Sequence, residues 1–155
     1  LCRPDGETEN NDELRELLVR MIRTYKPDVL ITHDPTARII NNRYPNHRDH
    51  RNVGDAALDA VFPLARDRLN YPEHEAEGLE PHKVLDVFLI FSDTPNYWVD
   101  VSSTVDKKIA ALREHKSQIA DMDALPERIY DRCRSAAEHV SFEFAETFHR
   151  VQLRG

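Results

Sequence analysis

Residues 10–33 read NNDELRELLVRMIRTYKPDVLITH, and this stretch decides the class of fold. From residue 10 to 26, apolar side chains recur every three or four positions and predict an amphipathic helix, with the stripe Leu14, Leu17, Leu18, Met21, Ile22 and Tyr25. Pro27 ends this helix, because the residue before a proline is disfavoured in helical space. The apolar run 29–32 then predicts a strand that is buried on both faces of a parallel sheet. A helix followed directly by such a strand indicates an α/β fold.

The rest of the chain continues this alternation of helices and strands. Four further segments have clear patterns, namely helices at 47–61 and 127–152 and strands at 84–91 and 97–101. Another helix is expected to start at Ser103, where Asp106 completes a capping box. The segment 63–83 contains three prolines and several acids, and we expect a surface excursion there. With 155 residues, the chain has the size of a single domain.

Composition and charge exclude several classes of partner. The net charge is −7 with both signs mixed along the chain, which argues against a nucleic-acid partner, because phosphate contacts need clustered Lys and Arg. No apolar run approaches the roughly 18 residues that span a bilayer, so we expect no membrane partner. Cys2 and Cys133 have no CxxC companion, so we expect free thiols in a reducing cytoplasm rather than a disulfide framework.

The densest group of reactive side chains follows the first predicted strand. In α/β sheets, ligands bind beyond the carboxyl ends of parallel strands, and we expect the loop after His33 and the helix start at His47 to meet at that edge. His47 and His50 are three positions apart and can face the same side of the helix, with Asp49 between them. One imidazole could bind a metal ion while the other donates a hydrogen bond or a proton, and the carboxylate could fix a tautomer.

Taken alone, this histidine cluster is equally consistent with a solvated surface. Short motifs recur by chance, and the chain contains eight histidines. A catalytic zinc ion usually has three protein ligands, and His33 and Asp34 are nearby candidates that no spacing requires. A nucleotide binder is a poor alternative, because the four glycines of the chain cannot build a phosphate-binding loop.

Several motifs together resemble those of one enzyme family. Residues 47–50, His-Arg-Asp-His, with Gly54 resemble the second signature of the LmbE-like (PIG-L) deacetylases, usually His-Pro-Asp-His followed by a glycine four residues on. Three other stretches agree in order and spacing, namely 1–7 with Asp-Gly, 26–33 with Pro-Asp-Val, and 100–118 with Lys-Ile-Ala-Ala-Leu and His-Lys-Ser-Gln. The resemblance therefore covers nearly the whole chain up to residue 118.

The resemblance implies a single α/β domain over residues 1–155, Rossmann-like and three-layered with a mostly parallel sheet. It implies a zinc-dependent hydrolase that removes an N-acetyl group from an N-acetylglucosamine-containing compound or a similar small amide. The implied cofactor is Zn2+ and the partner is a small N-acetylated sugar, with a homo-oligomer as a further option. Carried over by position, His50 matches a zinc ligand, His47 the histidine that stabilises the oxyanion or protonates the leaving amine, and Asp49 the carboxylate that pairs with His47.

The chain departs from the family pattern in two places. Arg48 replaces the usual proline, and we expect its side chain to point to solvent or to substrate. The first signature of the family, His-Pro-Asp-Asp-Glu, does not occur, and it would supply two zinc ligands and the general base. Because the chain also opens without Met, we expect an incomplete stretch of an enzyme whose N-terminal strands are missing. The alternative is a non-catalytic ligand-binding or oligomerisation module of the same fold that lacks the complete zinc site.

Overall fold

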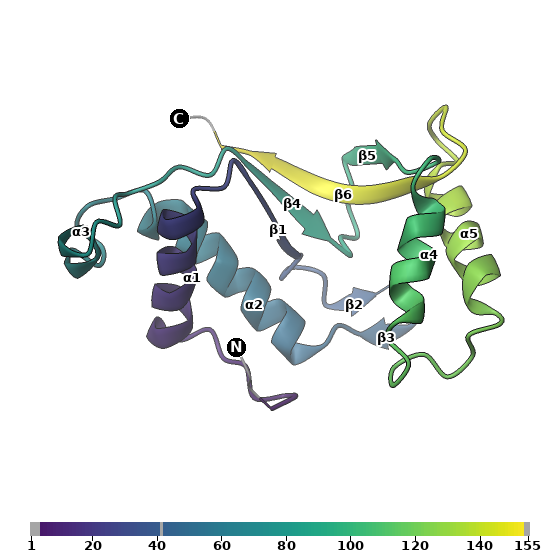
Figure 1. The fold of residues 1–155 in the computed structure, drawn as a ribbon, viewed down its shortest axis with the longest axis horizontal. Coiled ribbons are helices and arrows are strands. Elements are labelled where there is room, and N and C mark those ends of the chain that lie inside the picture. The colour runs from purple at the N-terminus through teal and green to yellow at the C-terminus, as the bar shows by residue number, and fades with distance from the viewer. Residues whose placement is uncertain (1–3, 41, 154–155) are drawn as a thin grey trace. The chain divides into compact units, whose positions relative to one another are not determined.

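The computed structural model describes residues 4–40 and 42–153, and the chain divides into two compact units (Figure 1). The first unit comprises Leu1–Thr94 and His149–Gly155, and the second comprises Pro95–Phe148. Each unit has its own cluster of buried apolar side chains. No helix in the described part of the chain is long and apolar enough to cross a bilayer.

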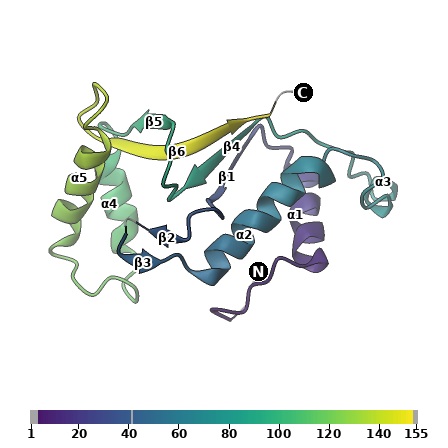
Figure 2. The ribbon, with the colours of Figure 1, turned by 180° about the vertical axis from the view of Figure 1, so that it is seen from behind.

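The helices and strands of the first unit largely follow the predicted pattern. It contains α1 (Asp12–Tyr25), β1 (Val29–His33), β2 (Ile39–Ile40), β3 (Tyr44–Pro45), α2 (Arg48–Asp59), the π-helical turn η1 (Ala60–Leu64), α3 (Glu73–Ala76) and β4 (Asp86–Ile90). The last strand, β6 (Ala145–Gln152), contributes its C-terminal half to this unit. Helices α1 and α2 lie side by side, as seen from behind in Figure 2. The helices predicted at 10–26 and 47–61 and the strands predicted at 29–32 and 84–91 are confirmed.

The sheet is mixed, which confirms the α/β class but not the expected strand directions. β1 pairs in parallel with β4, from Val29 opposite Asp86 to His33 opposite Ile90. β4 pairs antiparallel with β6, and β6 pairs antiparallel with β5 (Tyr97–Asp100). The prediction of a mostly parallel sheet is therefore wrong, since only one of these three pairings is parallel. The physical reason is that residues 145–152, which we predicted to be helical, form β6 and return along β4 in the opposite direction.

Helix α1 is fixed at its start by a cap and along its length by burial. The side chain of Asn11 accepts a hydrogen bond from the backbone N–H of Leu14, which satisfies one of the free donors of the first turn. Val19 and Ile22 are buried against η1 and β4. Arg23 is also buried, and its guanidinium donates to backbone carbonyls at the end of η1 and in the chain that follows, namely those of Leu64, Ala65, Asp67, Asn70 and Tyr71. This one side chain thus holds the beginning of the 63–83 excursion onto α1.

Strand β1 has a more exposed surface than its sequence predicts. Val29 is 46% and Ile31 is 62% exposed, although we expected both faces of this strand to be buried. Within residues 4–40 and 42–153, β1 pairs only with β4, so its other edge carries backbone groups without a strand partner. An apolar strand at a sheet edge is a surface to which further strands can add.

The second unit contains β5, α4 (Val105–Arg113), α5 (Leu125–Ala136) and the N-terminal half of β6. Its buried cluster joins both helices to the start of β6 and includes Val105, Ile109, Leu125, Ile129, Cys133 and Phe144. The predicted capping box at Ser103 is wrong, because α4 begins after Thr104 and has no side-chain cap. Cys133 is a free, buried thiol whose pKa burial raises. Cys2 lies outside the described residues.

Candidate functional site

A glycine brings the start of α2 against the end of β1. Gly54 is buried in α2, and a Cβ at this position would lie 2.5 Å from the backbone carbonyl oxygen of His33. Only a residue without a side chain therefore allows the helix to approach the strand this closely. His50, one turn earlier on α2, consequently stacks on His33 with ring centroids 4.0 Å apart and an interplanar angle of 8°.

The surroundings of the stacked pair disfavour the charged form of both rings. Burial lowers the pKa of His33, and the charge that His50 would carry lowers it further. Burial, and then the neighbouring His47, lower the pKa of His50. The Nδ1 atom of His33 is buried and has no hydrogen-bond partner among the described residues. Two neutral imidazoles, one with an unused nitrogen, are suited to bind a metal ion, because metal ligation requires the unprotonated ring nitrogen.

His47 lies at the entrance of α2 with its two ring nitrogens in different roles. Its Nδ1 accepts a hydrogen bond of 3.2 Å from the backbone N–H of Asp49 and so caps the helix. The neutral ring therefore carries its proton on Nε2. This atom lies 3.6 Å from a carboxylate oxygen of Asp5, and the side chain of His47 is 44% exposed. The Nε2–H group of His47 is thus accessible to solvent and lies close to the carboxylate of Asp5.

Asp49 fastens the N-terminal segment to α2. Its carboxylate accepts the backbone N–H of Gly6 at 2.8 Å and that of Thr8 at 3.2 Å. Partial burial would raise the pKa of Asp49, but these two hydrogen bonds and the nearby His47 lower it overall. By holding residues 6–8, Asp49 also fixes the position of Asp5 beside His47.

Arg48 strengthens the same attachment. Its guanidinium donates to the carbonyl oxygen of Gly6 at 2.7 Å and to the carboxylate of Glu9 at 2.9 Å. Arg48 is exposed, in agreement with the expectation that it points to solvent, and its charge also holds the N-terminal segment. A proline, which is usual here in the resembled motif, could not make these bonds.

The donors in this region fit a metal ion. Ligand atoms of Asp5, His47 and Asp49 all lie within 4.8 Å of one another. Imidazole nitrogen and carboxylate oxygen are the donor types that zinc takes in catalytic sites. The predicted ligand His50 is not in this group, although its ring centroid lies 5.3 Å from that of His47. The structure thus gathers all three predicted residues, His47, Asp49 and His50, and adds Asp5 and His33.

Asp34, the other nearby candidate, has a structural role. It is buried, and one carboxylate oxygen accepts both the backbone N–H of Thr36 at 2.9 Å and the hydroxyl of Thr36 at 2.6 Å. Burial would raise its pKa, but hydrogen bonds from Ser92 and Thr36 lower it overall. Asp34 therefore stabilises the turn after β1 rather than presenting a free carboxylate to a ligand.

Comparison with known proteins identifies the family. Residues 1–61, which carry the whole histidine cluster, match the family model PIG-L, described as GlcNAc-PI de-N-acetylase. The chain is 32% identical over 117 residues to the diacetylchitobiose deacetylase of Thermococcus kodakarensis, a match that covers 76% of this chain and 42% of that protein. Residues 1–61 of the chain belong to the PIG-L family.

One further curated protein and one solved structure are similar to this chain. The chain is 24% identical to a 1D-myo-inositol 2-acetamido-2-deoxy-alpha-D-glucopyranoside deacetylase of Mycobacterium sp., over 70% of this chain and 39% of that protein. Its fold matches that of N,N'-diacetylchitobiose deacetylase from Pyrococcus horikoshii with a TM-score of 0.83 and 24% identity, over 97% of this chain and 55% of that one. The chain thus spans about two fifths of the length of the curated relatives it matches.

Proposed function

We propose that the protein containing this chain is a zinc-dependent hydrolase that removes an N-acetyl group from an N-acetylglucosamine-containing compound or a similar small amide. The observation that carries the proposal is the convergence of His33, His47, His50, Asp5 and Asp49 within the segment that matches the PIG-L family. The acetylated amino sugars named for the two curated relatives support this substrate class. We further propose a cytoplasmic location and a Rossmann-like sheet for the whole protein.

His50 is the zinc ligand in this proposal. Its lowered pKa leaves the ring neutral near pH 7, which keeps a nitrogen lone pair available. His33, stacked on it, fixes the plane of the ring and offers its own unused Nδ1 as a neighbouring donor. A zinc ion held here would supply Lewis acidity towards the amide carbonyl and towards water.

His47 is the proton donor in this proposal. Its Nε2–H is exposed at the site and can donate a hydrogen bond to the oxygen of the tetrahedral intermediate. After the ring takes up the proton that the attacking water releases, it can pass a proton to the departing amine. Hydrolysis breaks the amide C–N bond, adds the oxygen of water to the carbonyl carbon and leaves acetate and a free amine. Asp49 supports His47 through its backbone N–H, which fixes the tautomer, and through its carboxylate, which positions the segment that carries Asp5.

Acetate release from N,N'-diacetylchitobiose by the complete gene product tests the proposal. We expect His47→Ala to lower kcat by roughly 10²–10⁴-fold, the range supplied by a general acid or base, while zinc content is retained. Asp55→Ala, which alters an exposed side chain of the same helix, is the matched control.

Two results would contradict the proposal. Unchanged acetate release in His47→Ala would remove His47 from the chemistry. No acetate release by the unaltered protein from any acetylated amino sugar, together with no bound metal, would instead favour the non-catalytic module of the same fold.

A further inference from the structure

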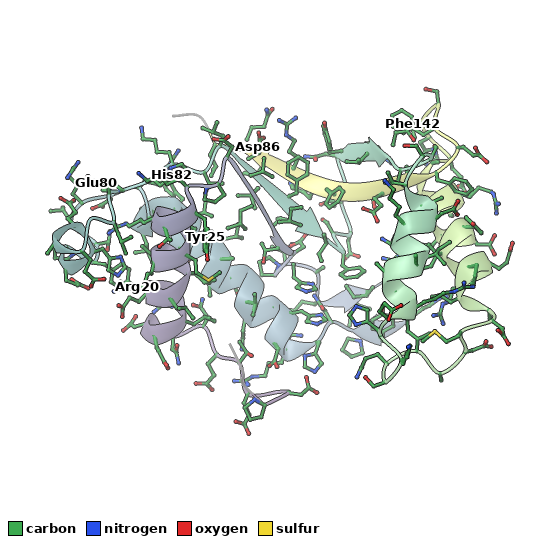
Figure 3. The ribbon with its side chains drawn as sticks, in the orientation of Figure 1. Arg20, Tyr25, Glu80, His82, Asp86 and Phe142 are labelled. Atoms are coloured by element: carbon green, nitrogen blue, oxygen red, sulfur yellow. The ribbon has the colours of Figure 1, made fainter. Side chains whose placement is uncertain are left out.

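A second group of metal-binding side chains lies where α3 meets α1, and it shares no residue with the candidate site. Glu16 is on α1, and Glu73 and His74 begin α3. One carboxylate oxygen from each glutamate and one ring nitrogen of His74 all lie within 4.8 Å of one another. Figure 3 shows Arg20, one turn after Glu16, on the side of α1 that faces the α3 excursion.

His74 gives an independent indication that a ligand belongs here. Its side chain is fully buried, and neither ring nitrogen has a hydrogen-bond partner in the part of the chain that the structure describes. One face of the ring stacks on Tyr71 with centroids 5.3 Å apart, so the ring is held in place by packing. A buried polar group without a partner is costly, and native structures rarely keep one without a ligand, ion or water beside it.

The unpartnered imidazole points towards the carboxylates. Its Nε2 lies 3.6 Å from a carboxylate oxygen of Glu16, too far for a hydrogen bond. Two ligand atoms that are each about 2.1 Å from one metal ion lie at most about 4.2 Å apart, so this separation fits a shared ion. Glu73 is exposed, and a small rotation of its side chain would complete a set of three ligands.

The surrounding charges leave the two carboxylates available. The guanidinium of Arg20 lies 3.7 Å from Glu16, but it is hydrogen-bonded to both carboxylate oxygens of Glu77. The neighbouring Glu75 is paired with Arg68. Arg20 is thus shared between Glu16 and Glu77, and Glu73 has no ion-pair partner among the described residues, so the two carboxylates are only partly balanced.

We propose that Glu16, Glu73 and His74 bind a divalent transition-metal ion, which fastens the 63–83 excursion to α1. Two carboxylates and one imidazole are a donor set that Zn2+ accepts, with water completing the coordination on the exposed side. The ion would satisfy the buried nitrogen of His74 and stabilise the short helix α3, which has no side-chain cap of its own. This site is independent of the proposed deacetylase activity.

Calorimetric titration with Zn2+ tests the proposal in the complete gene product that carries His47→Ala and His50→Ala, two changes that weaken binding at the candidate active site in every protein compared. We expect one Zn2+ ion to bind to Glu16, Glu73 and His74, and Glu73→Gln to weaken its binding at least ~10-fold, because even loss of an outer-shell partner costs about 10–100-fold. Glu13→Gln, which removes an exposed acid one turn before Glu16, is the matched control and should bind as before.

Proteolysis gives a second readout that does not depend on His74 variants, which could fail to fold. Zn2+ should slow tryptic cleavage after Arg68, within the excursion, in the protein with Glu73 but not in Glu73→Gln. The proposal is overturned if Glu73→Gln binds Zn2+ as tightly as the parent does, or if the parent shows neither Zn2+ binding nor slower cleavage.

Discussion

At the scale of single residues, the candidate site contains two histidines with lowered pKa values and an aspartate that is hydrogen-bonded to residues distant in the sequence. His33 and His50 have lowered pKa values because both are partly buried and lie close to other imidazoles. Asp49 is held by backbone N–H groups of residues more than 40 positions away in the sequence. These effects have consequences for stability that can be measured without substrate.

The free energy of unfolding of the metal-free protein should fall as the pH drops below about 6.5. The unfolded chain protonates His33 and His50 near that pH, whereas the folded protein, with lowered pKa values, does not, so the unfolded state binds more protons. Urea denaturation at about pH 7.5 and about pH 5.5 measures the difference. We expect His33→Phe, which keeps a stacked ring, to reduce this difference, and the exposed His139→Phe to leave it unchanged. If His33→Phe and the unaltered protein showed equal pH dependence of the unfolding free energy, His33 would not be a source of that dependence.

At the scale of secondary structure, the site depends on how closely α2 approaches β1. The segments 10–26, 29–32 and 47–61 are predictable from local patterns of apolar residues, prolines and caps. The stacking of His33 on His50 cannot be predicted in this way. It depends on the absence of a side chain at Gly54, which matters only because β1 packs directly against this position of α2. The position of Asp5 is likewise not predictable from local patterns, because hydrogen bonds from the neighbouring Gly6 and Thr8 to Asp49, across the fold, bring it to His47.

Gly54→Ala should therefore disturb both stability and the site. The added Cβ would lie 2.5 Å from the carbonyl oxygen of His33, so α2 or β1 must shift. Overpacking of this kind costs about 1–3 kcal/mol of unfolding free energy. Urea denaturation measures the loss, and Asp55→Ala, at the next and exposed position of α2, is the control. A Gly54→Ala protein as stable and as active as the control would show that the close approach is not required.

At the scale of the whole molecule, the helices and strands of the first unit are more predictable from the sequence than those of the second unit. The first unit follows a local alternation of helix and strand, with the exposed edge of β1 as the main difference. In residues 145–152, AETFHRVQ, polar and apolar residues do not alternate clearly, and only pairing with β4 and β5 makes them a strand. The segment 63–83, predicted as a surface excursion, contains the fully buried His74, whose burial depends on its packing near α1.

The exposed edge of β1 should make the 155-residue chain self-associate when it is produced alone. Val29 and Ile31 point to the same side of this strand, and apolar edge strands pair with other chains. Sedimentation velocity at increasing concentration should show association that Ile31→Lys reduces. Leu69→Lys, at an exposed loop position outside any strand, should have no effect. Equal association in the two variants would contradict a role for this edge.

The most direct test of the proposed zinc hydrolase site is the number of zinc ions per chain in the complete gene product, measured by elemental analysis for the unaltered protein, His50→Ala and His47→Ala. If His50 is the ligand and His47 the proton donor, His50→Ala loses one equivalent relative to the unaltered protein and His47→Ala loses none. If His50→Ala keeps its zinc, or if His47→Ala is the variant that loses it, the assignment of His50 as the ligand is contradicted, and in the second case the ion belongs to Asp5, His47 and Asp49.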